Sequence, residues 1–224
     1  MPPYLSTGAS RGLGASLTRC SLVAATDKKL AEELGSPKNL HIFEADITDY
    51  NAFKGAVEAV SEIAEGSLGY VIANAGLIAL WSQWDAVDML AKDPEHLVKD
   101  LQDSFNVNVI GNFHLFNLFT PLVLKGQGKK VIAISSGMSD IDFIRQFEIE
   151  PAPAYAISKA GTSVLTAKFA ARYAKEGVLF MSICPGSVNS GFEGELTEEQ
   201  KERWRSSGAS FSIMPRTSQA RAPL

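Results

Sequence analysis

The chain has 224 residues, and this length suits one α/β domain with a large hydrophobic core. Apolar residues make up 46% and charged residues 21%, as in soluble globular proteins, and a net charge of −4 without a basic stripe argues against a nucleic-acid partner. The longest apolar stretch, residues 70–80, is interrupted by Asn74 and Gly76 and is too short to span a bilayer, which argues against a membrane protein.

Strands and helices are expected to alternate along the chain. A short opening strand at residues 4–5 is followed by apolar runs at residues 40–44, 70–73, 130–134 and 178–183. Their continuous hydrophobicity is typical of parallel strands that are buried on both faces. Helical segments are predicted between these runs, at residues 51–64, 97–124 and 154–175. The alternation predicts an α/β fold, a Rossmann-type doubly wound parallel sheet flanked by helices.

The C-terminal part of the chain differs in composition from the rest. Residues 196–205 can form one helix, but residues 206–224 are rich in Ser, Arg and Pro and contain no convincing final strand. We therefore predict a single dinucleotide-binding and catalytic domain over residues 1–205 and a disordered tail over residues 206–224.

A glycine-rich segment, TGASRGLG at residues 7–14, follows the opening strand directly. Glycines in this place let the backbone turn sharply and approach a pyrophosphate, which the N-terminus of the next helix stabilises. The alternative is a glycine turn that binds nothing. The TGxxxGxG spacing resembles the short-chain dehydrogenase/reductase family, in its compact branch that also carries a YxxxK pair.

The resemblance implies that several other residues contact a nicotinamide dinucleotide. Asp46 matches an aspartate that contacts the adenine in the family, although it could instead be the N-cap of the next helix. The sequence Asn-Ala-Gly at residues 74–76 and the Pro-Gly pair at residues 185–186 also match family motifs, and Ser190 stands where threonine is more usual. The expected cofactor contacts are Gly8, Ser10, Arg11, Gly12, Leu13, Gly14, Asp46, Asn74, Ala75, Gly76, Tyr155, Lys159, Pro185, Gly186, Val188 and Ser190.

Tyr155 and Lys159 form a YxxxK pair on a predicted helix. Residues four apart share one helix face, so the lysine ammonium can lie near the phenol. A nearby positive charge favours the phenolate and lowers the pKa of a tyrosine, which would suit Tyr155 for general acid/base catalysis near neutral pH. The alternative is a surface pattern without chemistry, but the glycine loop and the Asn-Ala-Gly motif precede this pair in the order expected for the family.

Two further catalytic residues follow from the resemblance. Ser136 closes a strand at the carboxyl edge of the sheet and would hydrogen-bond the reacting oxygen, with Ser135 and Ser139 as rivals for that role. Asn108 matches an asparagine that in the family holds a water linking the lysine to solvent, with Asn106 as the nearby alternative.

Residues in and after the glycine loop also help to distinguish NADP from NAD as the expected cofactor. Arg11 occupies a position that is often basic in family members that use NADP, and its guanidinium could pair with the 2′-phosphate. At the end of the second strand Asp27 favours NAD, whereas Lys28 and Lys29 favour NADP. We expect NADP, with NAD as the alternative.

The chain departs from the family pattern in two places. Only residues 15–20 separate the glycine loop from the apolar run at residues 21–25, so either the first helix is stunted or residues 15–34 form one continuous helix and the second strand is lost. The family also usually continues further after Ser190, through a last strand that is missing here. The resemblance would suggest a homo-oligomer, but the short C-terminal part puts the usual interface in doubt.

The sequence says less about the residues that would contact the substrate. Residues 138–153 form a long predicted loop that we expect to flank the substrate, and Trp81, Trp84 and Phe192 could form an apolar wall for an aromatic ketone. Ordinary loop packing is the alternative for each. The amino-acid sequence, notably at residues 108–117 and 134–138, is similar to that of fungal family members, including ketoreductases of polyketide pathways.

The cysteines and histidines are few and scattered along the chain. The two cysteines, Cys20 and Cys184, form no CxxC pattern, and no signal peptide fits before the opening strand, so we expect a cytoplasmic protein. His41, His96 and His114 lack ligand spacing, so no metal site is expected.

The leading hypothesis is an oxidoreductase that acts on a small carbonyl or alcohol with NADP(H). The alternatives are a catalytically silent or truncated dinucleotide-binding protein, and an unstable fragment without a function of its own.

Overall fold

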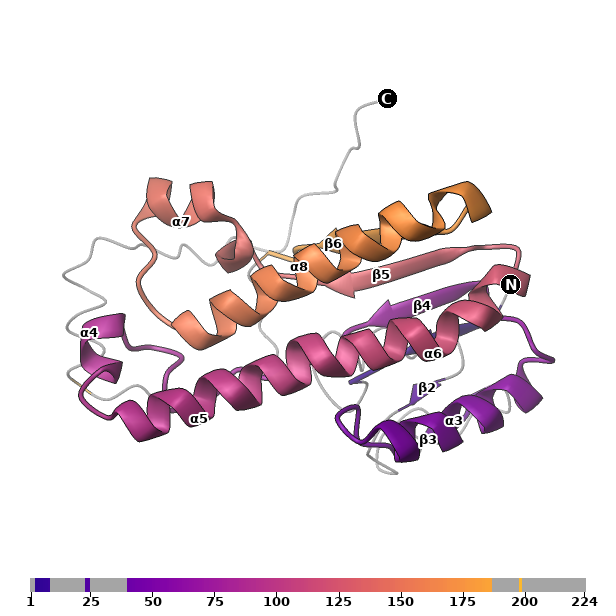
Figure 1. Cartoon of the computed structure of the whole chain (residues 1–224), viewed down its shortest axis with the longest axis horizontal. Helices are drawn as coiled ribbons and strands as arrows, with labels where there is room; N and C mark the ends of the chain where they lie inside the picture. The colour runs from indigo at the N-terminus through magenta and orange to yellow at the C-terminus, as the bar shows by residue number, and fades with distance from the viewer. Residues whose placement is uncertain (1–2, 9–22, 25–39, 187–197, 199–224) are drawn as a thin grey trace.

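The computed structural model describes residues 3–8, 23–24, 40–186 and 198. All strands of this part of the chain belong to one parallel sheet (Figure 1). The sheet has six strands in the order β3-β2-β1-β4-β5-β6, and every neighbouring pair is parallel. The strands are β1 (Tyr4–Ser6), β2 (Val23–Ala24), β3 (Ile42–Phe43), β4 (Tyr70–Ala73), β5 (Lys130–Ile134) and β6 (Leu179–Ile183). The predicted doubly wound sheet is confirmed, and its order reverses between β1 and β4, the point where such sheets bind ligands.

Helices cover one face of this sheet in the described part of the chain. Figure 1 shows α3, the long rod of α5 and α6, and α8 lying over the strands, and α3 contacts α6 while α5 contacts α8. The helices are α3 (Tyr50–Ile63), α4 (Val87–Leu90), α5 (Pro94–Phe105), the π-helical η2 (Asn106–Gly111), α6 (Asn112–Lys125), α7 (Ile141–Phe147) and α8 (Pro153–Tyr173), with 3-10 turns η3 (Gly137–Ser139) and η4 (Ala174–Glu176).

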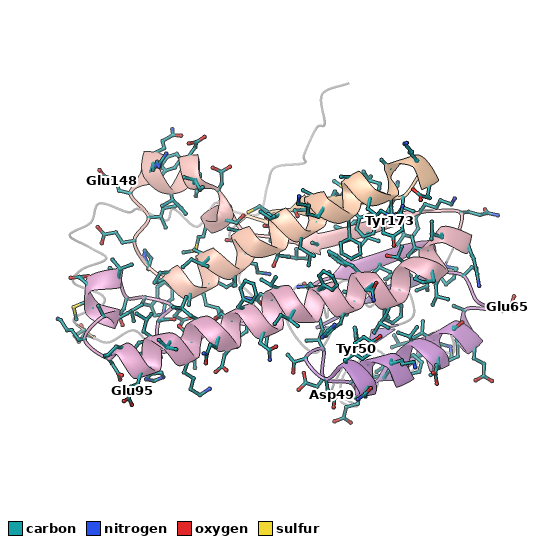
Figure 2. All side chains as sticks on the ribbon, viewed as in Figure 1. Asp49, Tyr50, Glu65, Glu95, Glu148 and Tyr173 are labelled. Atoms are coloured by element: carbon teal, nitrogen blue, oxygen red, sulfur yellow. The ribbon has the colours of Figure 1, made fainter. Side chains whose placement is uncertain are left out.

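Local sequence explains where the helices begin. The Asp49 carboxylate accepts hydrogen bonds from the backbone N–H groups of Asn51 and Ala52, and Figure 2 shows Asp49 at the start of α3. Asp93 caps α5 in the same way by accepting from the His96 N–H. Proline at the first helical position, as at Pro94, loses no hydrogen bond because that N–H has no partner within the helix.

The hydrophobic core lies between the central strands and this helical layer. Leu5, Val71 and Val131 of the strands are at most 1% exposed. Aromatic rings from the helices pack against them, and the rings of Phe53 and Phe119 meet edge to face with centroids 5.7 Å apart. Burial of these side chains fixes the helices on the sheet and so fixes the loops at its carboxyl edge.

Several expected boundaries differ in the structure. The continuous helix considered for residues 15–34 is wrong, because Val23–Ala24 is a strand paired with β1 and β3. The loop expected at residues 138–153 contains η3 and α7, and the helix expected at residues 97–124 begins at Pro94 and is interrupted by a π-helical turn. The first helix, the tail at residues 206–224 and any last strand lie outside the described residues.

One helical rod of the described residues, Pro94–Lys125, is long and apolar enough to cross a membrane by length and composition alone. Half of its most apolar window, 50%, is buried inside the protein, where Leu115, Phe116 and Phe119 belong to the core. A buried core helix passes the same test as a membrane span, and the packing of this rod accounts for its apolar composition.

Candidate active site

The carboxyl ends of β1, β4, β5 and β6 meet at one edge of the sheet because the strands are parallel. The segments that follow them carry most of the selected residues that the structure describes: Gly8, Asn74, Ala75, Gly76, Ser136, Pro185 and Gly186. The N-terminal half of α8 adds Tyr155 and Lys159.

The loop after β1 is tied to the loop after β4 by four hydrogen bonds. The Thr7 hydroxyl accepts from the backbone N–H groups of Asn74 and Ala75, at 3.1 and 3.0 Å. The Asn74 side-chain amide donates to the carbonyls of Thr7 and Gly8, at 3.1 and 2.9 Å. Gly8 has φ +63°, and a Cβ there would lie 2.7 Å from Ala75 Cα, so this position requires glycine. Sequence analysis assigned no role to Thr7, although it is the first residue of the recognised motif.

Tyr155 and Ser136 are brought together across the edge of β5. The Ser136 side chain is close enough to the phenol to influence its pKa, and the Ser136 hydroxyl accepts from the Met138 N–H at 3.2 Å, which caps η3. Burial raises the pKa of Tyr155 above its ordinary value, while the hydrogen bond with Ser136 acts in the opposite direction and the nearby Cys184 raises it further. The expectation that Tyr155 would have a lowered pKa is therefore wrong for this structure.

Lys159 explains why the expected electrostatic effect is weak. Its side chain is buried, 4% exposed, and Nζ lies 5.7 Å from the centroid of the Tyr155 ring. Nζ donates a hydrogen bond to the Ile134 carbonyl at 2.8 Å, and burial lowers the pKa of Lys159 to about 8. Burial therefore favours the neutral form of both the phenol and the amine, and it is the largest influence on the pKa of each.

Asn108 is fully buried in the π-helical turn η2, whereas Asn106 is exposed. The Asn108 side-chain oxygen accepts from the Leu77 N–H at 2.7 Å, and its amide donates to the Leu77 carbonyl and the Ser158 hydroxyl, both at 2.8 Å. A Cβ on Gly76 would lie 3.2 Å from both Asn108 Oδ1 and Lys159 Nζ. The structure thus brings Asn108, and not Asn106, to the lysine, while the water that Asn108 was expected to hold stays a prediction.

The rivals of Ser136 take part in a different network. Ser135 and Ser139 contact each other and Ser163 of α8 through their hydroxyls, and Ser135 is buried. Trp81, expected in a substrate wall, stacks on the His96 ring with centroids 4.0 Å apart.

Asp46 is exposed, and its carboxylate accepts from both the N–H and the hydroxyl of Thr48 at 2.8 Å. The alternative role as helix cap is wrong, because Asp49 caps α3. Adenine contact by Asp46 stays a prediction.

Other expected residues fall outside the described part of the chain. These are Ser10, Arg11, Gly12, Leu13, Gly14, Asp27, Lys28, Lys29, Val188, Ser190 and Phe192. Within the described ranges, no group of three or more His, Cys, Asp or Glu side chains could hold a metal ion.

Comparison with known proteins adds a further set of findings. A family model described as short chain dehydrogenase matches residues 4–201. The short chain dehydrogenase virK of Hypocrea virens is 47% identical over 213 residues, which cover 89% of this chain and 79% of virK. The short-chain dehydrogenase/reductase iacC of Pestalotiopsis fici is 39% identical over 214 residues, 89% of this chain and 79% of iacC.

Among solved structures, the chain is similar in fold to the NADPH-bound carbonyl reductase from chicken fatty liver. The TM-score is 0.74 at 24% identity, covering 89% of this chain and 85% of that one.

Proposed function

The chain belongs to the short-chain dehydrogenase family, and from this premise we propose that it transfers a hydride between NADP(H) and a ketone or secondary alcohol, with Tyr155 as general acid/base. The observation that carries the proposal is the placement of Tyr155 and Lys159 on α8, with Lys159 Nζ 5.7 Å from the centroid of the Tyr155 ring, at the edge of a doubly wound sheet where Ser136 follows β5.

The described residues fit a nicotinamide dinucleotide. Gly8 and Gly76 keep the loops after β1 and β4 free of side chains, and the positive φ of Gly8 sets the turn in which the pyrophosphate loop begins. The buried ammonium of Lys159 donates to the Ile134 carbonyl, which leaves N–H donors for the hydroxyls of the nicotinamide ribose. The preference for NADP rests on Arg11, supported by the NADPH-bound relative in fold.

Bound NADPH would supply the hydride, and the protein would supply the proton. Because burial raises the pKa of Tyr155, the phenol keeps its proton at neutral pH and can give it to a carbonyl oxygen as the carbon is reduced. Ser136 would donate a hydrogen bond to the same oxygen as negative charge develops on it. In the reverse direction Tyr155 would accept the alcohol proton.

The first test measures cofactor binding and turnover with the purified chain. NADPH should raise the melting temperature and change the cofactor fluorescence, and a panel of ketones should support NADPH oxidation. Tyr155→Phe should lower kcat by about 10²–10⁴-fold and leave NADPH affinity nearly unchanged.

Tyr173→Phe is a matched control, because Tyr173 lies near the other end of α8, where its ring stacks on Phe169 and Phe180 (Figure 2). It should leave turnover unchanged. Full activity of Tyr155→Phe would show that another group is the acid, and a protein that binds neither NADPH nor NADH would overturn the proposal.

A further inference from the structure

Three serine hydroxyls meet beneath the loop that carries Ser136, and together we call them the serine cluster: Ser135, Ser139 and Ser163. Ser135 Oγ lies 3.2 Å from Ser139 Oγ and 3.1 Å from Ser163 Oγ, and the latter two are 3.5 Å apart. Ser135 follows β5, Ser139 ends η3, and Ser163 lies on α8. The cluster therefore joins the loop after β5 to the helix of the YxxxK pair.

The outer bonds of the cluster end on the catalytic residues. Ser139 donates to the Ser136 carbonyl from its hydroxyl at 2.7 Å and from its N–H at 3.0 Å. On the other side, the Ser163 hydroxyl donates to the Lys159 carbonyl at 3.1 Å. A series of polar contacts thus runs from the backbone of Ser136 to the backbone of Lys159 without passing through a catalytic side chain, and three of its four links can be hydrogen bonds at one time.

The hydroxyls of the cluster have fewer protons than contacts. Each hydroxyl has one proton to donate, and the short contacts within the cluster and to the two carbonyls outnumber the protons available. The contacts must therefore share protons through rotation of the hydroxyls. Replacing Ser163 by alanine removes a donor and an acceptor at once and breaks the link between the cluster and α8.

The cluster holds the backbone of Ser136 and does not bond to the Ser136 hydroxyl. The Ser136 carbonyl is occupied by Ser139, and the Ser136 hydroxyl accepts from the Met138 N–H, so both ends of the residue are fixed. The Ser136 side chain in turn acts to lower the pKa of Tyr155.

We propose that the serine cluster is a positioning device that holds the Ser136 hydroxyl against the Tyr155 phenol, and that Ser163 is the positioning residue that couples the loop to α8. The inference rests on the proposed function for its catalytic consequence. Its structural part, the effect on Tyr155, can be measured without any substrate.

A competing explanation is that Ser163 only forms the common bond from a helix hydroxyl to a carbonyl four residues earlier. The chain offers a matched control for this case. Thr166, one turn along the same helix, donates to the Thr162 carbonyl at 2.8 Å, and among the described residues this hydroxyl has no recorded bond to the β5 loop.

The experiment compares Ser163→Ala, Ser163→Thr and Thr166→Ala in the full chain. Ser163→Ala should lower kcat by about tenfold or more, because small misplacements of a catalytic group are costly, with the KM for NADPH unchanged. Thr166→Ala should retain kcat, and Ser163→Thr, which keeps the hydroxyl, should restore most of it. The melting temperatures of the two alanine variants should be similar.

The second measurement follows the titration of Tyr155 by NMR with ¹³C-labelled tyrosine. The hydrogen bond with Ser136 lowers the pKa of Tyr155, so its weakening in Ser163→Ala should move the titration to higher pH. Thr166→Ala should leave it in place.

Equal kcat and equal Tyr155 titration in the two alanine variants would overturn the inference, as would loss of NADPH binding in Ser163→Ala alone. If the wild-type chain reduces no carbonyl compound, the proposed function fails, and the titration still decides whether the cluster positions Ser136.

Discussion

Burial sets the protonation states of the two central catalytic candidates, and it acts on them in opposite directions. It raises the pKa of the Tyr155 phenol and lowers the pKa of the Lys159 amine to about 8. The sequence identified both residues through their spacing, but it predicted the wrong direction for Tyr155. Four-residue spacing reports proximity along a helix, whereas desolvation depends on the elements that pack against α8, among them β5, β6 and η3.

This difference predicts the alkaline limb of the reductive reaction. Between neutral pH and about 8 both the phenol proton and the ammonium are present, and above about 8 the ammonium is lost first because its folded pKa is depressed. We expect kcat/KM for ketone reduction to fall above about pH 8. In Lys159→Arg the side chain stays charged, so any remaining activity should persist to higher pH.

The control is Lys168→Arg, because Lys168 is exposed on the same helix. Its pH–rate profile should match that of the wild type. An unchanged alkaline limb in a folded, NADPH-binding Lys159→Arg protein would show that another group titrates.

At the scale of elements, α7 was the least predictable part of the site. It has only seven residues, and three of its four apolar side chains, Ile141, Phe143 and Phe147, are 64%, 39% and 55% exposed, so no buried stripe marks it as a helix. Asp140 starts it by accepting from the Phe143 N–H, and Glu148 ends it with φ +50° (Figure 2). A capping residue and a left-handed residue each occur in loops as well, so neither distinguishes a short helix from a loop in the sequence.

The position of Phe143 leads to a prediction about substrates. A Cβ on Gly137 would lie 3.2 Å from Phe143 Cε1, so this partly exposed ring lies beside the backbone next to Ser136. We expect Phe143→Ala to raise KM for fused-ring ketones by about 2- to 10-fold relative to small aliphatic ketones, since an aromatic contact is worth about 0.5–1.5 kcal/mol.

Steady-state kinetics with matched ketone pairs would check this. Ile141→Ala, at a more exposed position of α7, should leave the ratio unchanged. An equal loss for both classes of ketone would show that Phe143 supports the loop and does not contact the substrate.

The long rod of α5 and α6 shows the complementary case. Its helical pattern was evident in the sequence, but the π-helical turn in it was not, because one extra residue per turn leaves the apolar pattern nearly unchanged over six residues. The strands β4, β5 and β6 were predicted almost to the residue because they are continuous apolar runs, while β2 has only two residues and was in doubt.

At the scale of the whole molecule, Asn108 ties the rod, the loop after β4 and α8 together. Its side chain bonds Leu77 and Ser158, and its carbonyl accepts from Asn112 and Thr162, both at 2.7 Å. We expect Asn108→Ala to lower the free energy of unfolding by about 2–4 kcal/mol, because buried partners on two other elements lose their hydrogen bonds.

Urea unfolding would measure this, with the m-value as a check on the folded state. Asn106→Ala, in the same π-helical turn but exposed, should cost less than about 0.5 kcal/mol. Equal losses in the two variants would mean that the turn, and not the Asn108 amide, provides the stability.

The bonds between Thr7 and Asn74 have a consequence for the synthesis of the chain. The two residues are 67 positions apart, so the N-terminal glycine turn leaves the ribosome well before its bonding partners are translated. Contacts of such long range carry a large loop-closure entropy and form late in folding. The joined loops after β1 and β4 can therefore form only after β4 has been synthesised and has paired with β1. No contact between neighbouring residues can take their place in the emerging chain.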